Sequence, residues 1–593
     1  MTPLTHTAAA RGSDFATNSR LLLLSGFAVV IGVLSTLGAM ILLAAIRLFT
    51  NLFFFQTLSL AERSPAGNHL GLAVILVPAL GGLIVGLMAR YGSEKIRGHG
   101  IPEAIEAILF GKSRMSPKIA ILKPLSSGIA IGSGGPFGAE GPIIMTGGAA
   151  ASLLAQVFHL TASERKALLV AGACAGMTAV FGTPLAALLL AVELLLFELR
   201  PRSLLPVALS CAIAGFIRPM WAGSGPLFPL QTIEVTPIAM LSCCLAGLAA
   251  GAVSASMTRM LYYIEDLFSH LKVHWMWWPA IGGLVVGVGG FLQPRALGVG
   301  YDVINDLLQH HLLFSAAVTL LVVKICIWAV ALGSGTSGGV LAPLLMIGAG
   351  LGSVLAPWLP GGSPQLWALV CMAAILGGTM RAPMMAIVFA FGLTHDVNAF
   401  LPTILACAVA YGFTVIVMPR SILTEKLARR GRHVFREYGV DPLERHFVED
   451  VMTRDVITIP ATELVREVVA RFFGSTQMHR AYPVVRGARF VGMLDRSILA
   501  SLPPEALDQP LSAVLESREV TEAFVLRGDS CRAVALRLAA EGLERMVVVD
   551  DPGARGVVGI VTRSDLLKPS RVVHDEDIRR EQVLGRGSGP SHI

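Results

Sequence analysis

The stretch Gly132-Ser-Gly-Gly-Pro-Phe-Gly-Ala-Glu140-Gly-Pro142 lies between two long apolar segments and decides the fold around it. It holds five glycines, two prolines and one carboxylate. These residues exclude an uninterrupted membrane helix, because glycine and proline break helices and leave backbone N–H groups without partners. At membrane depth such backbone is tolerated only where it is buried in protein or lines a watery cavity. We therefore expect Glu140 to lie on an ion path whose walls are helix N-termini.

The composition indicates a membrane protein with an attached soluble part. Of the 593 residues, 54% are hydrophobic and 15% are charged, whereas soluble globular chains carry about 25% charged residues. The charged residues crowd towards the C-terminal end, which favours a membrane body followed by a soluble unit. The net charge of +7 therefore gives no reason to expect a nucleic-acid partner.

Basic residues flank the apolar region on both sides. Arg11 and Arg20 precede the first long apolar run, and Arg429, Arg430 and Arg432 follow the last one. Since cytoplasmic segments next to membrane spans carry an excess of Lys and Arg, we expect both termini to be cytoplasmic.

Several apolar segments are too short, or too rich in Gly and Pro, to cross about 30 Å of hydrocarbon upright. Short and broken helices in a large membrane protein indicate a transport site near mid-depth. The eight cysteines form no C-x-x-C pair, so we expect neither a disulfide framework nor a metal site.

The membrane region repeats itself at a nearly constant spacing. Gly132-Ser-Gly, Gly138, Pro142 and Met145 recur 201 residues later as Gly333-Ser-Gly, Gly339, Pro343 and Met346, and Lys123 recurs as Lys324. Gly98-x-Gly100 recurs as Gly298-x-Gly300. A colinear series of such matches predicts two structural halves, as in transporters built from internal repeats.

Beyond about residue 440 the pattern changes to a tandem α/β unit. The first unit is expected to have β-α-β-β order. Its elements are a strand at Val456–Ile459, a helix near 463–473 and strands that begin at Ala481 and Phe490. A second unit follows, with a helix near 530–541 and two further strands. We therefore expect six regions: a cytoplasmic N-terminal segment (1–19), a membrane domain (20–430), a linker (431–447), two α/β units (448–505 and 511–570) and a disordered tail (571–593).

Four membrane segments resemble, in order, the signature segments of the CLC family of chloride channels and chloride–proton antiporters. They are Gly98-His-Gly-Ile-Pro-Glu103, Gly138-Ala-Glu140-Gly-Pro142, Gly339-Val-Leu-Ala-Pro343 and Ser421-Ile-Leu-Thr-Glu-Lys-Leu-Ala-Arg-Arg430. The tandem unit resembles the CBS pair that some members carry. The resemblance implies an all-α polytopic membrane domain with two internal repeats and broken helices, plus an α/β cytoplasmic CBS pair. It also implies a homodimer in a bacterial inner membrane, with lipid and chloride or a similar anion as partners.

The resemblance assigns a gate and an anion site. Glu140 matches the family's gating glutamate, whose carboxylate imitates the anion and swings away once it is protonated. The backbone N–H groups at Gly100–Ile101 and Val340–Leu341 would bind the anion without a full charge. This suits conduction, because an ion must leave as readily as it enters. The alternative is that Glu140 is neutralised by a buried partner.

Two departures from the family pattern affect the anion site. His99 stands where the family commonly has Ser, and a neutral imidazole N–H could donate to the anion in the same way. Alternatively His99 turns away and the backbone alone binds. Leu423 replaces the Tyr whose hydroxyl usually completes the site, and with Val340 and Leu341 it predicts a hydrophobic constriction.

A third departure concerns proton coupling. Proton-coupled members carry two consecutive glutamates, and here the second is Leu194, directly after Glu193. Leucine cannot relay a proton, so the internal proton route is interrupted. Glu193 and Glu198 lie nearby and could substitute, although a shift of one helix position turns a side chain by about 100°.

In the CBS pair, Thr562 and Asp565 keep the polar positions that hold the ribose and phosphate of an adenine nucleotide. The first unit has Asp495 and Ile498 instead, so nucleotide binding is expected at one site at most. A structural or dimer-contact use of the pair is the alternative. Lys123 and Lys324 are expected to be structural, or to draw anions inward.

The sequence therefore predicts a pH-gated passive conductor of chloride, and no enzyme. A proton-coupled chloride exchanger is the nearest alternative, and a membrane-bound adenine-nucleotide sensor is a more distant one. Divalent-cation transport is disfavoured, because it requires carboxylate-rich pore segments.

Overall fold

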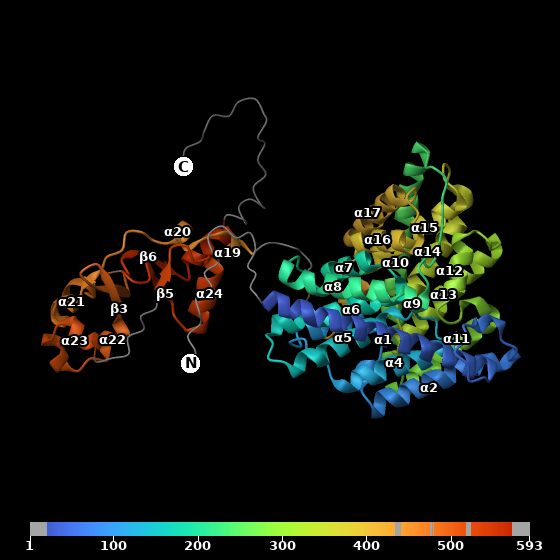
Figure 1. The fold of residues 1–593 in the computed structure, drawn as a ribbon, viewed down its shortest axis with the longest axis horizontal. Helices are drawn as coiled ribbons and strands as arrows, with labels where there is room; N and C mark the ends of the chain where they lie inside the picture. Colours follow the sequence, from blue (N-terminus) through green and yellow to red (C-terminus); the bar gives the residue numbers. More distant parts are fainter. Residues whose placement is uncertain are drawn as a thin grey trace. The chain divides into compact units, whose positions relative to one another are not determined.

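The computed structural model describes residues 20–432, 434, 441–474, 477, 479–516 and 524–571. The described chain divides into a larger unit, up to residue 434, and a smaller one, from residue 441. The expected N-terminal segment (1–19) and the tail beyond residue 571 lie outside the described residues. Figure 1 shows that the larger unit is helical and that the smaller one contains strands as well.

The first half of the larger unit holds one long helix and a series of shorter ones. They are α1 (Arg20–Phe55), α2 (Leu76–Tyr91), α3 (Ile101–Leu109), α4 (Pro117–Gly132), α5 (Glu140–Val157), α6 (Ala162–Phe181), α7 (Pro184–Leu190), α8 (Pro201–Ile217) and α9 (Pro219–Ala222). A π-helical turn, Ala191–Leu196, continues α7.

The second half repeats this order. Its helices are α10 (Pro237–Ser269), α11 (Trp278–Leu292), α12 (Tyr301–Leu308), α13 (Phe314–Gly333), α14 (Leu341–Leu355), α15 (Pro364–Met380), α16 (Pro383–Thr394), α17 (Phe400–Val417) and the final α18 (Ile422–Arg429). Each helix from α1 to α8 thus has a counterpart from α10 to α17, in the same sequence.

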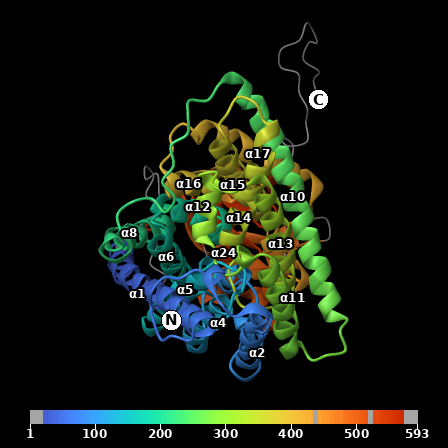
Figure 2. The same cartoon turned by 90° about the vertical axis from the view of Figure 1, so that its right-hand side faces the viewer.

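A two-fold relation between the halves is visible in their contacts. Gly138 and Gly339 are equivalent residues and pair with each other, each N–H donating to the other's carbonyl at 3.2 and 2.9 Å. Equivalent helices α2 and α11 lie side by side (Figure 2). A Cβ on Gly82 would lie 2.2 Å from the Pro279 carbonyl oxygen, and one on Gly283 would lie 2.4 Å from that of Pro78. Exchanged contacts of this kind are the mark of a two-fold axis, and the predicted internal repeat is confirmed.

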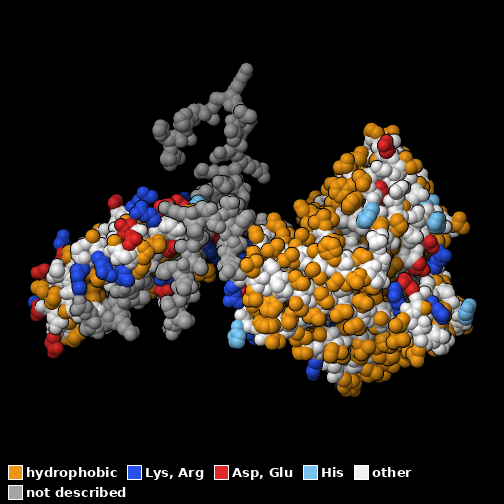
Figure 3. Space-filling model, in the orientation of Figure 1, with side chains coloured by type: hydrophobic (Ala, Val, Ile, Leu, Met, Phe, Trp, Pro, Cys, Tyr) orange, Lys and Arg blue, Asp and Glu red, His pale blue; other side chains and the backbone are white. Residues whose placement is uncertain are grey.

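The outer surface of the larger unit is apolar, as expected for contact with lipid. Among the described residues, eight helices are long and apolar enough to cross a membrane. Their outward side chains remain apolar, with Phe216 81% and Ile416 85% exposed. Figure 3 shows hydrophobic side chains over most of the visible face of this unit, and more Lys, Arg, Asp and Glu on the smaller one. The protein is therefore an integral, multi-pass membrane protein.

The expected breaks in the membrane helices occur in both halves. α4 ends at Gly132 and α5 begins at Glu140, and α13 ends at Gly333 before α14 begins at Leu341. The chain reverses at Gly134 and Gly335, whose φ angles of 98° and 80° favour glycine. The polar loop is thus folded back between helices and not stretched across the membrane.

The smaller unit contains two three-stranded sheets of the same design. Its elements are α19 (Pro442–Arg445), α20 (Val448–Val451), β1 (Ile459–Pro460), α21 (Val465–Phe472), β2 (Ala481–Arg486), β3 (Arg489–Asp495), α22 (Arg496–Ala500), α23 (Leu511–Glu516), β4 (Phe524–Leu526), α24 (Cys531–Ala540), β5 (Arg545–Val549) and β6 (Val557–Thr562). In each sheet the first strand is parallel to the second and the third is antiparallel. The predicted α/β pair is confirmed.

One predicted strand is wrong in its bounds. The expected strand Val456–Ile459 is reduced to β1, because the segment before it pairs with the second unit instead. Thr453 pairs with Ile560 of β6, and the Val448 N–H donates to the Asp529 carbonyl at 2.9 Å. The residues leading into the first α/β repeat thus complete the core of the second.

Candidate functional site

Three chain segments of the membrane unit meet at Gly141, in the first turn of α5. A Cβ atom built on Gly141 would lie 1.9 Å from the carbonyl oxygen of His99 and 3.3 Å from the Cα atom of Gly339. The backbone before α3, the start of α5 and the backbone before α14 therefore touch. Only glycine permits so close an approach.

Helices α3, α5 and α14 begin here without side-chain caps. Their N-cap residues Gly100, Ala139 and Val340 offer no side-chain acceptor to the first N–H groups within the described chain. The start of α18 differs, because the Ser421 and Thr424 hydroxyls cap each other's N–H groups. The positive ends of α3, α5 and α14 are thus left for another negative group.

Glu140 supplies that negative group. Its side chain is fully buried, and the N–H groups of Glu140 and Ala342 face its carboxylate. A Cβ on Gly138 would lie 1.8 Å from Oε2 of Glu140, and one on Gly339 would lie 2.7 Å from it. None of the described groups makes a well-aligned hydrogen bond to the carboxylate. The carboxylate therefore lies at the positive helix ends, which attract its charge.

Tyr301, the first residue of α12, meets Glu140 from another side. Its hydroxyl oxygen is buried and faces the carboxylate. Its ring centroid lies 6.1 Å from that of Phe181 and 6.2 Å from that of Phe228. Sequence reasoning missed this residue, because the equivalent of Tyr301 in the first half is the apolar Ile101, which follows Gly98-x-Gly100.

His99 is 2% exposed, and within the described chain its Nδ1 atom has no hydrogen-bond partner. It lies among charged side chains, which include Lys426 and Glu103. Arg430 holds Glu103 at 2.7 Å. An unpaired, buried imidazole nitrogen beside the uncapped start of α3 is able to bind a ligand.

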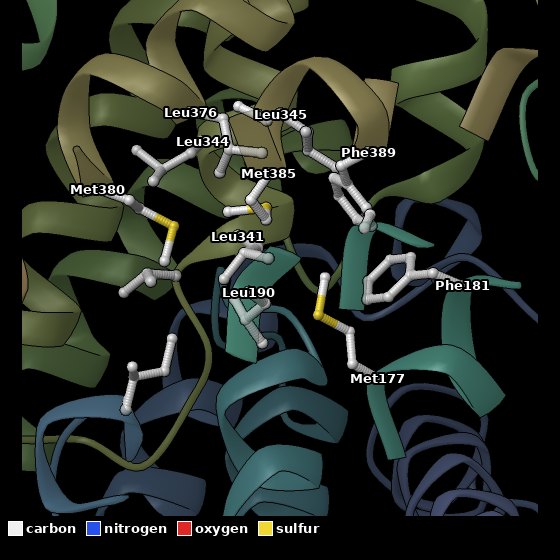
Figure 4. Close-up of a cluster of buried hydrophobic side chains, with 14 of the residues drawn as sticks. Met177, Phe181, Leu190, Leu341, Leu344, Leu345, Leu376, Met380, Met385 and Phe389 are labelled. Atoms are coloured by element: carbon white, nitrogen blue, oxygen red, sulfur yellow. The ribbon is translucent and has the colours of Figure 1, made fainter. Parts of the chain in front are cut away.

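The apolar residues expected at the anion site, Val340, Leu341 and Leu423, are fully buried, as is Leu194 at the expected proton-pathway position. Leu423 lies on α18, which packs against α3. Figure 4 shows Leu341 among apolar side chains that include Leu190 and Met385, with Phe181 facing Phe389. Leu341, at the start of α14, thus packs among buried apolar side chains.

The two buried lysines hold the loops that precede α3 and α12. Lys123 donates to the carbonyls of Ile96 and Gly98, both at 2.8 Å. Lys324 donates to the equivalent carbonyls of Ala296 and Gly298 at 2.9 and 3.1 Å. These contacts match the structural role expected for the two lysines, and not the alternative of drawing anions inward.

Comparison with known proteins agrees with this architecture. A family model described as "Voltage gated chloride channel" matches residues 81–415, more than half of the chain. The chain belongs to the CLC family. CBS domain models match residues 448–504 and 518–570 of this CLC protein.

The CLC protein has relatives in both sequence and structure. It is 32% identical over 352 residues to the "Voltage-gated ClC-type chloride channel ClcB" of Salmonella typhimurium, covering 57% of this chain and 82% of the relative. A slow cyanobacterial Cl⁻/H⁺ antiporter has a TM-score of 0.61 at 21% identity, covering 70% and 99% of the two chains. A eukaryotic CLC transporter has a TM-score of 0.59 at 18% identity, covering 92% and 98%. These two structures support the fold alone.

The expected proton-pathway position of this CLC protein lies in the π-helical turn after α7. Leu194 is buried there, and the carboxylate of Glu193 accepts the N–H groups of Met384 and Met385 at 3.2 and 2.8 Å. Glu193 thus caps the N-terminus of α16. Glu198, the other nearby acid, accepts a hydrogen bond from Ser203 at 2.7 Å.

Two of the cavities in the described part of the CLC membrane unit are each lined by several charged side chains. One, of about 610 Å³, is lined at α3 and α18 by Glu103, Lys426 and Arg430. The other, of about 420 Å³, is lined by Tyr301, Arg47 and Arg218 among others. We call the first the α18 basin and the second the Tyr301 basin. His99 lies near the charged residues of the first, and Glu140 lies behind Tyr301 of the second.

In the CBS pair the two expected nucleotide-binding residues bind each other. The Thr562 hydroxyl donates to Asp565 at 2.7 Å, and Lys568 lies 2.7 Å from the same carboxylate. Burial opposes ionisation of Asp565, but the hydrogen bonds from Lys568 and Thr562 hold its pKa below the ordinary value. In the first unit, Asp495 instead accepts the N–H of Ile498 at 2.8 Å and caps α22.

Proposed function

We propose that this CLC protein conducts chloride passively, with Glu140 as a pH-responsive gate. The observation that carries the proposal is the carboxylate of Glu140 at the uncapped starts of α5 and α14, a place that suits an anion. Chloride is the bound ion of the proposal, and no other cofactor is required.

The gate works by replacement of one negative charge with another. While it is ionised, the Glu140 carboxylate occupies the helix ends and excludes chloride. Protonation removes the charge, so the side chain is no longer held, and chloride takes its place at the backbone N–H groups of Gly100–Ile101 and Val340–Leu341. Backbone dipoles bind without a full charge, and the ion leaves as readily as it enters.

Passive flow is favoured over proton-coupled exchange by the residues around position 194. Leu194 has no titratable group, and both carboxylate oxygens of Glu193 accept backbone N–H groups. A second acid on the route to Glu140 is therefore not free to relay protons. The channel name of the ClcB relative, at 32% identity, supports the same choice. The reversal potential of the reconstituted protein under separate chloride and pH gradients tests it.

His99 is proposed to bind the conducted anion with its unpaired imidazole. His99→Ala should keep acid activation, which belongs to Glu140, but should change the preference between chloride and a competing anion about fivefold, the value of one hydrogen bond of about 1 kcal/mol. Anion-competition flux from liposomes measures this preference. An unchanged preference would mean that His99 is turned away and the backbone alone binds.

The remaining assignments concern assembly. We propose a homodimer with one pore per subunit, placed in a bacterial inner membrane with both termini and the CBS pair in the cytoplasm. The CBS pair is assigned a structural or dimer-contact role, because Asp565 is already bound by Thr562 and Lys568. An adenine nucleotide at Thr562 and Asp565 would have to displace the Lys568 ammonium. We propose no enzymatic activity.

A further inference from the structure

Tyr301 stands between Glu140 and the Tyr301 basin. Its hydroxyl oxygen is buried and faces the Glu140 carboxylate, whereas other atoms of the residue line the basin together with Arg47 and Arg218. Phe181 and Phe228 contact its ring. Tyr301 therefore belongs both to the surroundings of the carboxylate and to the lining of this basin.

The two-fold relation of the halves indicates that the fold does not require this hydroxyl. The residue equivalent to Tyr301 is Ile101, which follows Gly100 as Tyr301 follows Gly300. Ile101 is fully buried at the start of α3 and carries no polar atom on its side chain. A buried hydroxyl without a well-aligned partner costs free energy, so its presence in one half alone calls for a use.

We propose that Tyr301 is a positioning residue of the gate, whose hydroxyl donates a hydrogen bond to the ionised Glu140 carboxylate and holds it in the closed position. Its ring closes the opening to the Tyr301 basin in the same state. This proposal rests on the proposed function, since it acts through the Glu140 gate.

The basic side chains near Glu140 are bound to other partners, so Tyr301 remains as the side-chain donor to its carboxylate. The titratable groups on neighbouring segments include His99, Glu103 and Lys123 near the start of α3. They also include Asp302 and Lys324, which donates to the Gly298 carbonyl before α12. Lys123 is bound to backbone carbonyls and Glu103 to Arg430. Helix α14 contains no titratable residue, and α6 has its charged residues in the first turns. Glu62 reaches Tyr301 from the basin side. Tyr301 is the described side chain whose hydroxyl meets the Glu140 carboxylate.

The test is Tyr301→Phe, which removes the hydroxyl and keeps the ring and the packing. Loss of a hydrogen bond to a charged group makes the closed state less stable, so chloride flux at neutral pH should rise about tenfold. The pH of half-maximal activation should move upwards by about one unit, because protonation of Glu140 then competes with one interaction fewer. Chloride efflux from liposomes across a range of pH measures both. Unchanged flux and pH profile would overturn the proposal.

A double variant separates positioning from a structural effect. In the Glu140→Gln background no carboxylate remains to be held, so adding Tyr301→Phe should change flux less than about twofold. The same increase in both backgrounds would overturn the proposal, since Tyr301 would then act through packing. Tyr411→Phe is the matched control, because Tyr411 lies on the surface of α17 at 36% exposure, and its flux and pH profile should equal those of wild type.

The outcomes distinguish the positioning role of Tyr301 from the gating role of Glu140 on which it rests. Acid-activated flux that Glu140→Gln makes insensitive to pH, but that Tyr301→Phe leaves unchanged, overturns the positioning role and keeps the gate. Wild-type flux without acid activation overturns the gate and the positioning role together.

Discussion

Glu140→Gln should give chloride flux that no longer rises with acidity, and that at neutral pH equals the acid-activated flux of wild type. Glutamine has nearly the shape of a protonated glutamic acid but takes up no proton. The amide therefore stays in the state in which the helix ends are free for chloride. In wild type, flux should rise by up to about tenfold per pH unit while the carboxylate is still mostly ionised.

Chloride efflux from liposomes between neutral and acidic pH measures the effect. Glu193→Gln is the matched control, because Glu193 is a buried acid of the same unit whose oxygens accept the N–H groups of Met384 and Met385. It should keep full acid activation. Acid activation that survives in Glu140→Gln would remove Glu140 from the gate, and its loss in Glu193→Gln would restore a proton route from that side.

Gly141→Ala should abolish chloride flux, with a loss of at least about a hundredfold if the protein still folds. The new methyl group would lie 1.9 Å from the His99 carbonyl oxygen and 3.3 Å from the Cα atom of Gly339. Both neighbours are backbone and cannot turn aside as a side chain would. The starts of α3 and α14 must therefore move away from α5, and the positive ends no longer converge on one anion.

Gly412→Ala is the matched control for this variant. Gly412 also lies within a membrane helix, α17, but a Cβ atom there meets nothing within 4 Å. Its flux should equal that of wild type, and its thermal stability should be equal or slightly higher, since alanine favours a helix by about 1 kcal/mol over glycine. Flux in Gly141→Ala equal to that of Gly412→Ala would contradict the convergence of helix starts at this point.

Much of the fold could be predicted because it follows from the local conformational preferences of the residues. Glycines and prolines between Gly132 and Pro142 can only interrupt a helix, and their recurrence from Gly333 implies two related halves. The exchanged contacts of Gly82 with Pro279 and of Gly283 with Pro78 then follow from symmetry. The alternation of apolar residues after about residue 480 likewise indicated strands.

The parts that could not be predicted depend on contacts between distant segments. Tyr301 lies 161 residues from Glu140 in the sequence, and its equivalent, Ile101, is apolar, so the repeat gave no hint of a hydroxyl at the gate. The cap on α16 by Glu193 joins residues 191 positions apart. β1 is short because residues 448–453 pair with the second CBS unit. Local β-propensity could not predict this pairing, because its partners are distant in the sequence.

The central claim is that chloride flows passively past Glu140 and carries no protons in return. The most direct test is the reversal potential of the reconstituted full-length protein, with the chloride gradient fixed while the pH gradient is reversed. A passive chloride pathway predicts a potential of about 59 mV per tenfold chloride gradient, unchanged by the direction of the pH gradient. A reversal potential that shifts with the pH gradient would contradict the claim and identify the protein as a proton-coupled exchanger.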